Sequence, residues 1–201
     1  SLLVRKDVVA ALGDWDEVKV NADTEFYERC VAKFGQAAIK EVMPDVPLSF
    51  GRTHSSSLTQ NAETHLVTQY GGVRKQYMDC ARAWHKNSPS LKLLRNEPRP
   101  FPVPPSMLLA SSNPSLVKEN AASFNKWRKA LDENWYAQVY DDVSSMGLDI
   151  YDHFWDRGEQ EGRYPSLLFN PQAYAYKFEL PNTVSPTWHA LRNDSWDFSA
   201  P

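Results

Sequence analysis

Two pairs of side chains in the last third of the sequence have a spacing that suits metal binding. Asp149 and His153 are four residues apart, as are Asp152 and Asp156, so each pair would share one face of a helix. Carboxylate oxygens together with one imidazole are able to hold a divalent cation. A metal site within a helical bundle also needs Glu or His ligands from a second helix, and no matching set occurs elsewhere in the sequence. We therefore interpret these side chains as a solvated acidic face.

A second candidate for chemistry is His54, which is followed by three serines at positions 55–57. A histidine can activate a hydroxyl as a nucleophile, but residues adjacent in sequence seldom have the required geometry, and a polar turn explains the cluster better. Asp141 and Asp142 form a further charged pair without a partner, and no Walker-A, GxGxxG, GxSxG or HExxH pattern occurs. The sequence therefore predicts no catalytic, cofactor-binding or metal-binding residue, and an enzyme is the least favoured class.

Composition and charge narrow the class of partner. The chain has 201 residues, of which 42% are hydrophobic and 12% aromatic, and its formal net charge is −3. Nucleic-acid binding normally needs a basic stripe, and no apolar run approaches the length that spans a bilayer. Cys30 and Cys80 lie in different helical patterns, which indicates reduced, buried thiols in a reducing compartment. These features favour other proteins as partners, and a fold with no transmembrane segment of its own.

Hydrophobic periodicity predicts a mostly α fold. Residues 1–88 form a helical region with three patterns: a short helix within 1–20, one from about 23 to 42, and one over about 58–86. Gly71 and Gly72 interrupt the third pattern, so two shorter helices remain an alternative.

The most regular pattern covers residues 113–156 and predicts one long amphipathic helix. Asn113 suits an N-cap and Pro114 the first helical position. Unbroken, this helix would be roughly 60 Å long, and Gly147 is the one expected break or kink. Its apolar stripe, with steps of three or four residues, comprises Phe124, Trp127, Leu131, Trp135, Val139, Val143, Met146, Ile150 and Phe154.

The segments on either side of this helix read as extended. Residues 89–112 carry many prolines and predict a stiff polyproline spacer, or a segment lying in a partner's groove. Residues 157–201 form an aromatic and proline-rich tail whose composition is unlike that of disordered segments. Within the tail, residues 173–180 alternate in the manner of a strand, which pairs either with another subunit's sheet edge or in a hairpin folded back on the helices.

Large side chains of the helix and the tail are the candidates for contact with partner subunits. Packing in the chain's own core is the alternative for those on the helix. The candidate residues are Trp127, Trp135, Val143, Tyr174, Tyr176, Phe178, Trp188 and Trp196.

Residues 23–47 carry a pattern of an acidic residue, an aromatic pair, Val-Ala-Lys-x-Gly, a further helix and a proline. The matching positions are Asp23, Phe26, Tyr27, Val31, Ala32, Lys33, Gly35 and Pro47, and Arg163, Tyr164 and Pro165 match a basic-Tyr-Pro element near the C-terminus. This segment resembles the peripheral-stalk subunit d of mitochondrial F-type ATP synthases. The resemblance implies a non-catalytic subunit without cofactors, on the matrix side of the inner membrane, within a complex that couples proton transport to ATP synthesis.

We therefore expect a non-catalytic structural subunit of a large mitochondrial energy-converting complex, such as an ATP synthase peripheral-stalk or accessory subunit. A self-assembling helical coat or filament protein and an accessory subunit of a respiratory-chain complex are the alternatives. If the chain is not mitochondrial, its thiols still predict a reducing intracellular compartment. The chain begins at Ser1, and removal of a targeting segment is left open.

Overall fold

The computed structural model describes residues 2–41, 57, 61–62, 64–95, 97–109, 114–193 and 195, with only the backbone described over 114–118. The chain forms two compact units, residues 1–121 and residues 122–201, and their boundary lies within helix α4. The predicted mostly helical fold class is confirmed, and the described residues contain isolated β-bridges but no strand. The sequence analysis divides the chain into four segments, whereas the structure has two units. None of the described helices is long and apolar enough to cross a bilayer.

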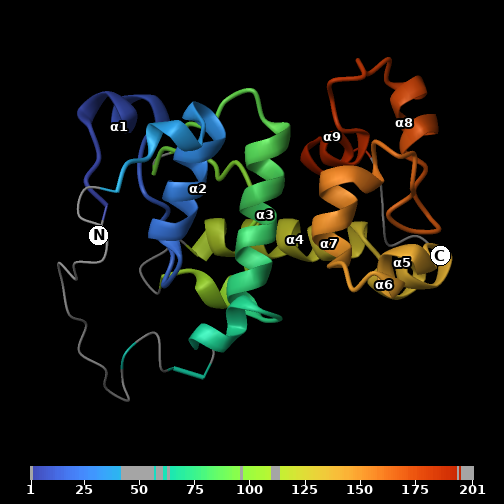
Figure 1. Cartoon of the computed structure of the whole chain (residues 1–201), viewed down its shortest axis with the longest axis horizontal. Helices are drawn as coiled ribbons and strands as arrows, with labels where there is room; N and C mark the ends of the chain where they lie inside the picture. The colour runs from blue at the N-terminus through green and yellow to red at the C-terminus, as the bar shows by residue number, and fades with distance from the viewer. Residues whose placement is uncertain are drawn as a thin grey trace. The chain divides into compact units, whose positions relative to one another are not determined.

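The first unit is built around the packing of α2 against α3, which lie side by side in Figure 1. Its helices are α1 (Lys6–Leu12), α2 (Ala22–Phe34) and α3 (Val73–Asn87), with 3₁₀ helices η1 (Gln36–Ala38), η2 (Leu66–Gln69) and η3 (Pro105–Met107). α2 ends earlier than predicted because Gly35 takes φ 79°. The glycine pair separates η2 from α3, so the alternative of shorter helices is the one that forms. Cys30 and Cys80 are buried free thiols, and burial raises the pKa of both.

The proline-rich segment is not a spacer between domains in its described parts, 89–95 and 97–109. Apart from η3 it lies extended in the core of the first unit, where six apolar side chains of the segment are buried: Leu91, Leu93, Phe101, Val103, Met107 and Leu108. Alternate residues of an extended chain point the same way, so Leu91 and Leu93, and Phe101 and Val103, enter the core together. Bridges from Leu93 to Gly13 and from Leu108 to Val18 hold this segment to the start of the chain.

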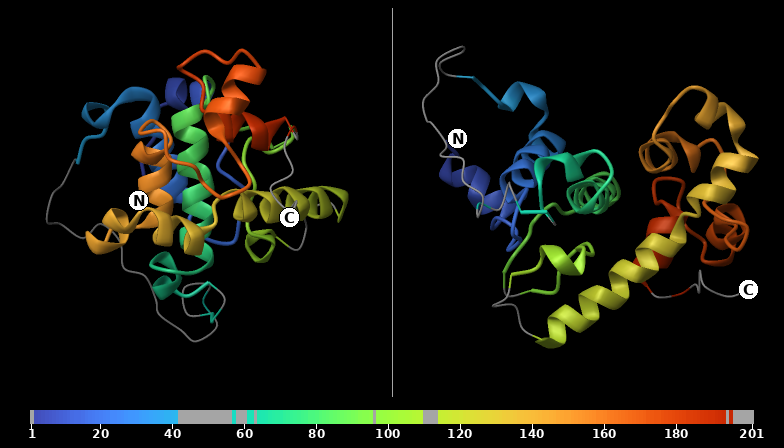
Figure 2. Two further views of the ribbon diagram at one scale, coloured as in Figure 1. Left: turned by 90° about the vertical axis from the view of Figure 1, so that its right-hand side faces the viewer. Right: turned by 90° about the horizontal axis from the view of Figure 1, so that it is seen from below.

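The single helix predicted over 113–156 is wrong, because the described chain is broken three times within it. α4 (Pro114–Ala130) is the longest helix of the described chain at 17 residues, and Figure 2 shows it unbroken. It is followed by α5 (Glu133–Val139), α6 (Asp141–Ser145), α7 (Ile150–His153) and a π-helical turn (Phe154–Gly158). Asp132 and Asp149 accept hydrogen bonds as the N-caps of α5 and α7, and Gly147 takes φ 66° between α6 and α7. Asn113 lies outside the described residues.

The predicted strand over 173–180 is also wrong, since α8 (Pro171–Lys177) covers most of it and α9 (Pro186–Arg192) follows. Asn170 caps α8 by accepting from the N–H of Ala173, and Pro171 occupies the first helical position. Tyr174 and Phe178 are four residues apart, so the alternating aromatics also satisfy helical spacing, and their ring centroids lie 4.5 Å apart. Residues 157–193 are therefore folded into the second unit rather than extended.

The core of the second unit contains the aromatic side chains of both the helix and the tail. Trp155 stacks on Trp127 with ring centroids 4.8 Å apart, and Trp188 meets both edge-on. Two further groups of buried side chains complete this core: Leu131, Tyr136, Val143 and Phe154, and Ala130, Phe169, Tyr174 and Ala190.

Candidate functional site

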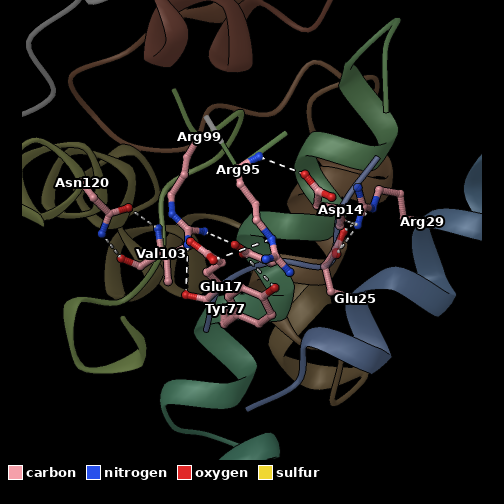
Figure 3. Close-up of polar contacts among 10 residues, drawn as sticks. Asp14, Glu17, Glu25, Arg29, Tyr77, Arg95, Arg99, Val103 and Asn120 are labelled. Carbon is pink, nitrogen blue, oxygen red and sulfur yellow. Dashed lines mark hydrogen bonds and ion pairs between the residues drawn. The ribbon is translucent and has the colours of Figure 1, made fainter. Parts of the chain in front are cut away.

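A fully buried ion pair joins two residues one turn apart on α2. Neither Glu25 nor Arg29 has an exposed side chain, and Arg29 Nε lies 3.0 Å from Glu25 Oε1. Arg29 also donates to the carbonyl oxygens of Leu12 and Asp14, each at 2.8 Å, and His85 Nε2 lies 2.8 Å from Glu25 Oε1. Figure 3 shows Arg29 between Glu25 and Asp14. The guanidinium therefore satisfies the carbonyls at the C-terminal end of α1, which is a structural role.

A second polar cluster links α3 to the segment that follows α1 and to the proline-rich segment. The hydroxyl of Tyr77 donates to Asp16 Oδ2 at 3.0 Å, and Arg99 pairs with the other oxygen of Asp16 and donates to the Glu17 carbonyl. In Figure 3, Tyr77 and Arg99 converge on this region. Burial, followed by the charge of Asp16, raises the pKa of Tyr77 well above its ordinary value. Here too the charged groups hold segments together.

The raised pKa of Tyr77 predicts a loss of stability in alkali. The folded state keeps this proton more tightly than the unfolded state, so its contribution is complete below a pH of about 10 and is lost as the pH rises further, by up to about 1.4 kcal/mol per pH unit. We expect Tyr77→Phe to unfold more readily than wild type near neutral pH, because it loses the bond to Asp16, but to weaken less between about pH 9 and pH 11. Urea unfolding at both pH values checks this, and equal alkaline losses would contradict it.

Each described histidine has a structural partner. His65 Nδ1 accepts from the N–H of Val67, His153 Nδ1 lies 3.1 Å from the Tyr136 hydroxyl, and His189 Nδ1 lies 3.0 Å from the Tyr174 hydroxyl. His65 thus caps η2, whereas His153 and His189, together with His85, which is held by Glu25, link pairs of helices. His54 lies outside the described residues, so the predicted polar turn there is not described.

The side chains of the acidic pairs in the 149–156 region differ in their exposure. Asp149, Asp152 and Asp156 are exposed, while His153 is buried against Tyr136. Asp149 accepts from the N–H of Asp152 at 3.1 Å, which is a helix cap rather than a ligand geometry. Within the part of the chain that the structure describes, no three His, Cys, Asp or Glu side chains are grouped so that they could hold a metal ion.

The predicted partner contacts divide into buried and exposed residues. Four of the eight are core residues of the second unit, namely Trp127, Val143, Tyr174 and Trp188, because the broken helix folds back on itself and on the tail. These four are corrected from interface to core. Trp135 is partly buried, and Trp196 lies outside the described residues. Tyr176 and Phe178 are exposed, so for them contact with a partner stays a prediction.

A different apolar surface emerges on η2, and we call Leu66, Val67 and Tyr70 the 66–70 surface. Their exposed fractions are 48%, 62% and 77%. The helical spacing of the third sequence pattern predicts that Leu66 and Tyr70 lie on the same face as the core residues of α3. The chain breaks at the glycine pair, so η2 does not continue the face of α3. The glycine pair is the sequence signal for this change, because it marks the point where the helical face of α3 ends.

The backbone beneath the 66–70 surface is held firmly. Arg74, which is 5% exposed, donates from Nε to the carbonyl oxygen of Thr64 at 2.8 Å. The N–H of Gly72 donates to the carbonyl of Thr68 at 2.9 Å, and a Cβ at Gly72 would lie 2.7 Å from Thr68 Cβ. The apolar side chains therefore stand on a fixed turn, so little conformational entropy would be lost if a partner covered them.

A shallow hollow of about 550 Å³ lies where α4 ends and α5 begins. Its rim carries Arg128 and Lys129 as well as Asp132 and Glu133, all exposed. Side chains of both signs in open solvent select no particular ligand.

Searches of protein-family models, curated proteins and solved structures with this chain gave no match.

Proposed function

We propose that this chain is a non-catalytic structural subunit that binds neighbouring subunits of a large assembly. The observation that carries the proposal is the 66–70 surface, where three large apolar side chains are exposed on an anchored turn. Exposed apolar side chains grouped in this way are typical of protein–protein contact sites. Within the described residues, the buried charged groups Asp16, Glu25 and Arg29 join helices and extended segments, which supports a structural rather than a catalytic role.

The assembly that we propose is a mitochondrial energy-converting complex, with the chain as an ATP synthase peripheral-stalk or accessory subunit on the matrix side. The resemblance over 23–47 supports this choice. Its acidic, aromatic and Val-Ala-Lys positions all lie on α2, and Gly35 ends that helix. An accessory subunit of a respiratory-chain complex remains the alternative. The coat or filament alternative has lost its main support, because it depended on one long helix with extended arms.

The test replaces Leu66, Val67 and Tyr70 together by Ser in the full-length chain. The thermal midpoint should change little, since these side chains are exposed, whereas incorporation into the native complex should fall because binding loses about 2 kcal/mol or more. Native gels of mitochondrial membranes, with mass spectrometry of the co-migrating subunits, measure incorporation and identify the complex.

The matched control is Leu167→Ser, which removes a side chain that is 74% exposed in a turn of the second unit. We expect this variant to assemble normally. Normal assembly of the triple variant would contradict the role of the 66–70 surface, and a free, unassembled wild-type chain would contradict the proposed function.

A further inference from the structure

The second unit is acidic, and its negative charge is concentrated in one stretch. Residues 122–201 contain seven Lys and Arg against twelve Asp and Glu, whereas residues 1–121 contain fifteen against thirteen. Residues 141–156 hold five Asp and neither Lys nor Arg. Arg163 donates to both oxygens of Asp142 at 2.8 and 2.7 Å. Asp141 on α6, Asp149 between α6 and α7, and Asp152 on α7 are exposed, as is Asp156 in the π-helical turn that follows α7.

Two large apolar side chains are exposed in the middle of this acidic stretch. Met146 is 64% exposed and Leu148 is 44% exposed, one on each side of Gly147. Met146 follows Asp142 by four residues, and the N–H of Met146 donates to the Asp142 carbonyl at 3.1 Å, so both lie on one face of the same helical turn. Leu148 is followed directly by Asp149. We call Asp142, Met146, Leu148, Asp149 and Asp152 the α6–α7 surface.

The backbone of the α6–α7 surface is fixed by contacts to buried groups. The N–H of Leu148 donates to the carbonyl of Val143 at 3.2 Å, and the Val143 side chain is fully buried. Gly147 supplies the φ of 66° that this turn needs. Asp149 caps α7, which fixes the position of its carboxylate relative to Leu148.

We propose that the α6–α7 surface binds a basic amphipathic helix of a neighbouring subunit, and this inference rests on the proposed function. Met146 and Leu148 would cover the apolar face of such a helix, and Met adapts readily to the shape of a helical partner. The surrounding carboxylates select Lys and Arg on its polar face and repel acidic partners. The same charges disfavour nucleic acid and anionic lipid headgroups, so a basic protein segment is the occupant that the surface fits.

The experiment measures binding of the 201-residue chain to two synthetic helical peptides by fluorescence anisotropy. Both carry Leu on one face, with Lys on the other face of the first peptide and Glu on that of the second. We expect the Lys peptide to bind, the Glu peptide to bind at least about tenfold more weakly, and the affinity for the Lys peptide to fall as salt rises.

Variants assign the binding to the α6–α7 surface. The double variant Met146→Ser and Leu148→Ser should bind the Lys peptide about tenfold more weakly. Asp149→Asn with Asp152→Asn should bind it several-fold more weakly at low salt and almost as wild type at high salt, and the Asn at position 149 still suits the N-cap of α7. Leu167→Ser, in another turn of the same unit, should bind as wild type.

Equal binding of both peptides, no binding of either, or full binding by the Met146 and Leu148 double variant would each overturn the inference. These outcomes leave the proposed function standing if the 66–70 variant still fails to assemble, because that surface belongs to the first unit. A wild-type chain that is found unassembled would contradict the proposed function. If the Lys peptide still binds that chain as expected, the charge selectivity of the α6–α7 surface is supported independently.

Discussion

Replacing Arg29 by Met is expected to lower the free energy of unfolding of the first unit by about 3–5 kcal/mol. The guanidinium has no exposed surface, and its loss leaves the carboxylate of Glu25 buried with His85 as the remaining partner. The carbonyls of Leu12 and Asp14 lose their donors as well. A buried charge that loses its partner is costly because water cannot replace it.

A surface ion pair provides the control for this variant. Arg5 and Asp7 also form a salt bridge, at 2.8 Å, but their side chains are 82% and 64% exposed. We expect Arg5→Met to cost no more than about 1 kcal/mol. Urea unfolding, with hydrogen exchange of α2 and α3 to assign the loss to the first unit, compares the two.

A double variant separates the energy of the pair from the energy of an orphaned charge. Glu25→Leu combined with Arg29→Met should be more stable than Arg29→Met alone, because no unpaired carboxylate remains in the core. Equal losses for Arg29→Met and Arg5→Met would show that the α2 pair is accessible to water, contrary to its burial.

Replacing Gly13 by Ala is expected to cost about 3–5 kcal/mol or to prevent folding of the first unit, because it combines backbone strain with the loss of two hydrogen bonds. Gly13 takes φ 78° and ψ −144°, a region that residues with a Cβ rarely enter. A Cβ there would lie 2.0 Å from the carbonyl oxygen of Leu93. Moving Leu93 away would break the bonds from Asp14 N–H to the Leu93 carbonyl and from Leu93 N–H to the Leu12 carbonyl.

Gly35→Ala is the matched control, since Gly35 takes φ 79° and nothing lies within 4 Å of its Cβ position. That variant should cost only the backbone strain, about 1–3 kcal/mol. The difference between the two variants in urea unfolding measures how firmly the proline-rich segment is held to the end of α1. Equal costs would mean that Leu93 moves freely, and the packing of that segment described above would then be incorrect.

The alternation of residues 173–180 shows why local pattern alone does not distinguish a strand from a short helix. Tyr174, Tyr176 and Phe178 fit a period of two, yet Tyr174 and Phe178 also fit one helical turn. The choice was made by Asn170 and Pro171, which begin a helix, and by the burial of Tyr174 against Phe169. These capping residues can be read from the sequence, but only the packing shows that the segment forms a helix rather than a strand.

The stretch from 113 to 156 is a similar case at larger scale. Its apolar residues do keep helical spacing, because α4 to α7 each present one apolar side to the same core. The spacing holds across the breaks at Asp132, Tyr140 and Gly147, so it does not reveal them. Asp149 and His153 likewise read as a pair on one helical face, whereas Asp149 caps the helix that contains His153.

The sequence by itself determined that this protein is mostly helical, and it offered the glycine pair as an alternative break between helical elements, because helical period and glycine conformation are local properties. Only the tertiary structure decided which apolar residues are covered. Leu93 and Val103 are buried in a proline-rich segment that reads as a spacer, whereas Tyr70 and Met146 are exposed in patterns that read as core. Burial depends on which distant segments fold against a residue, and that is a property of the whole chain rather than of its local period.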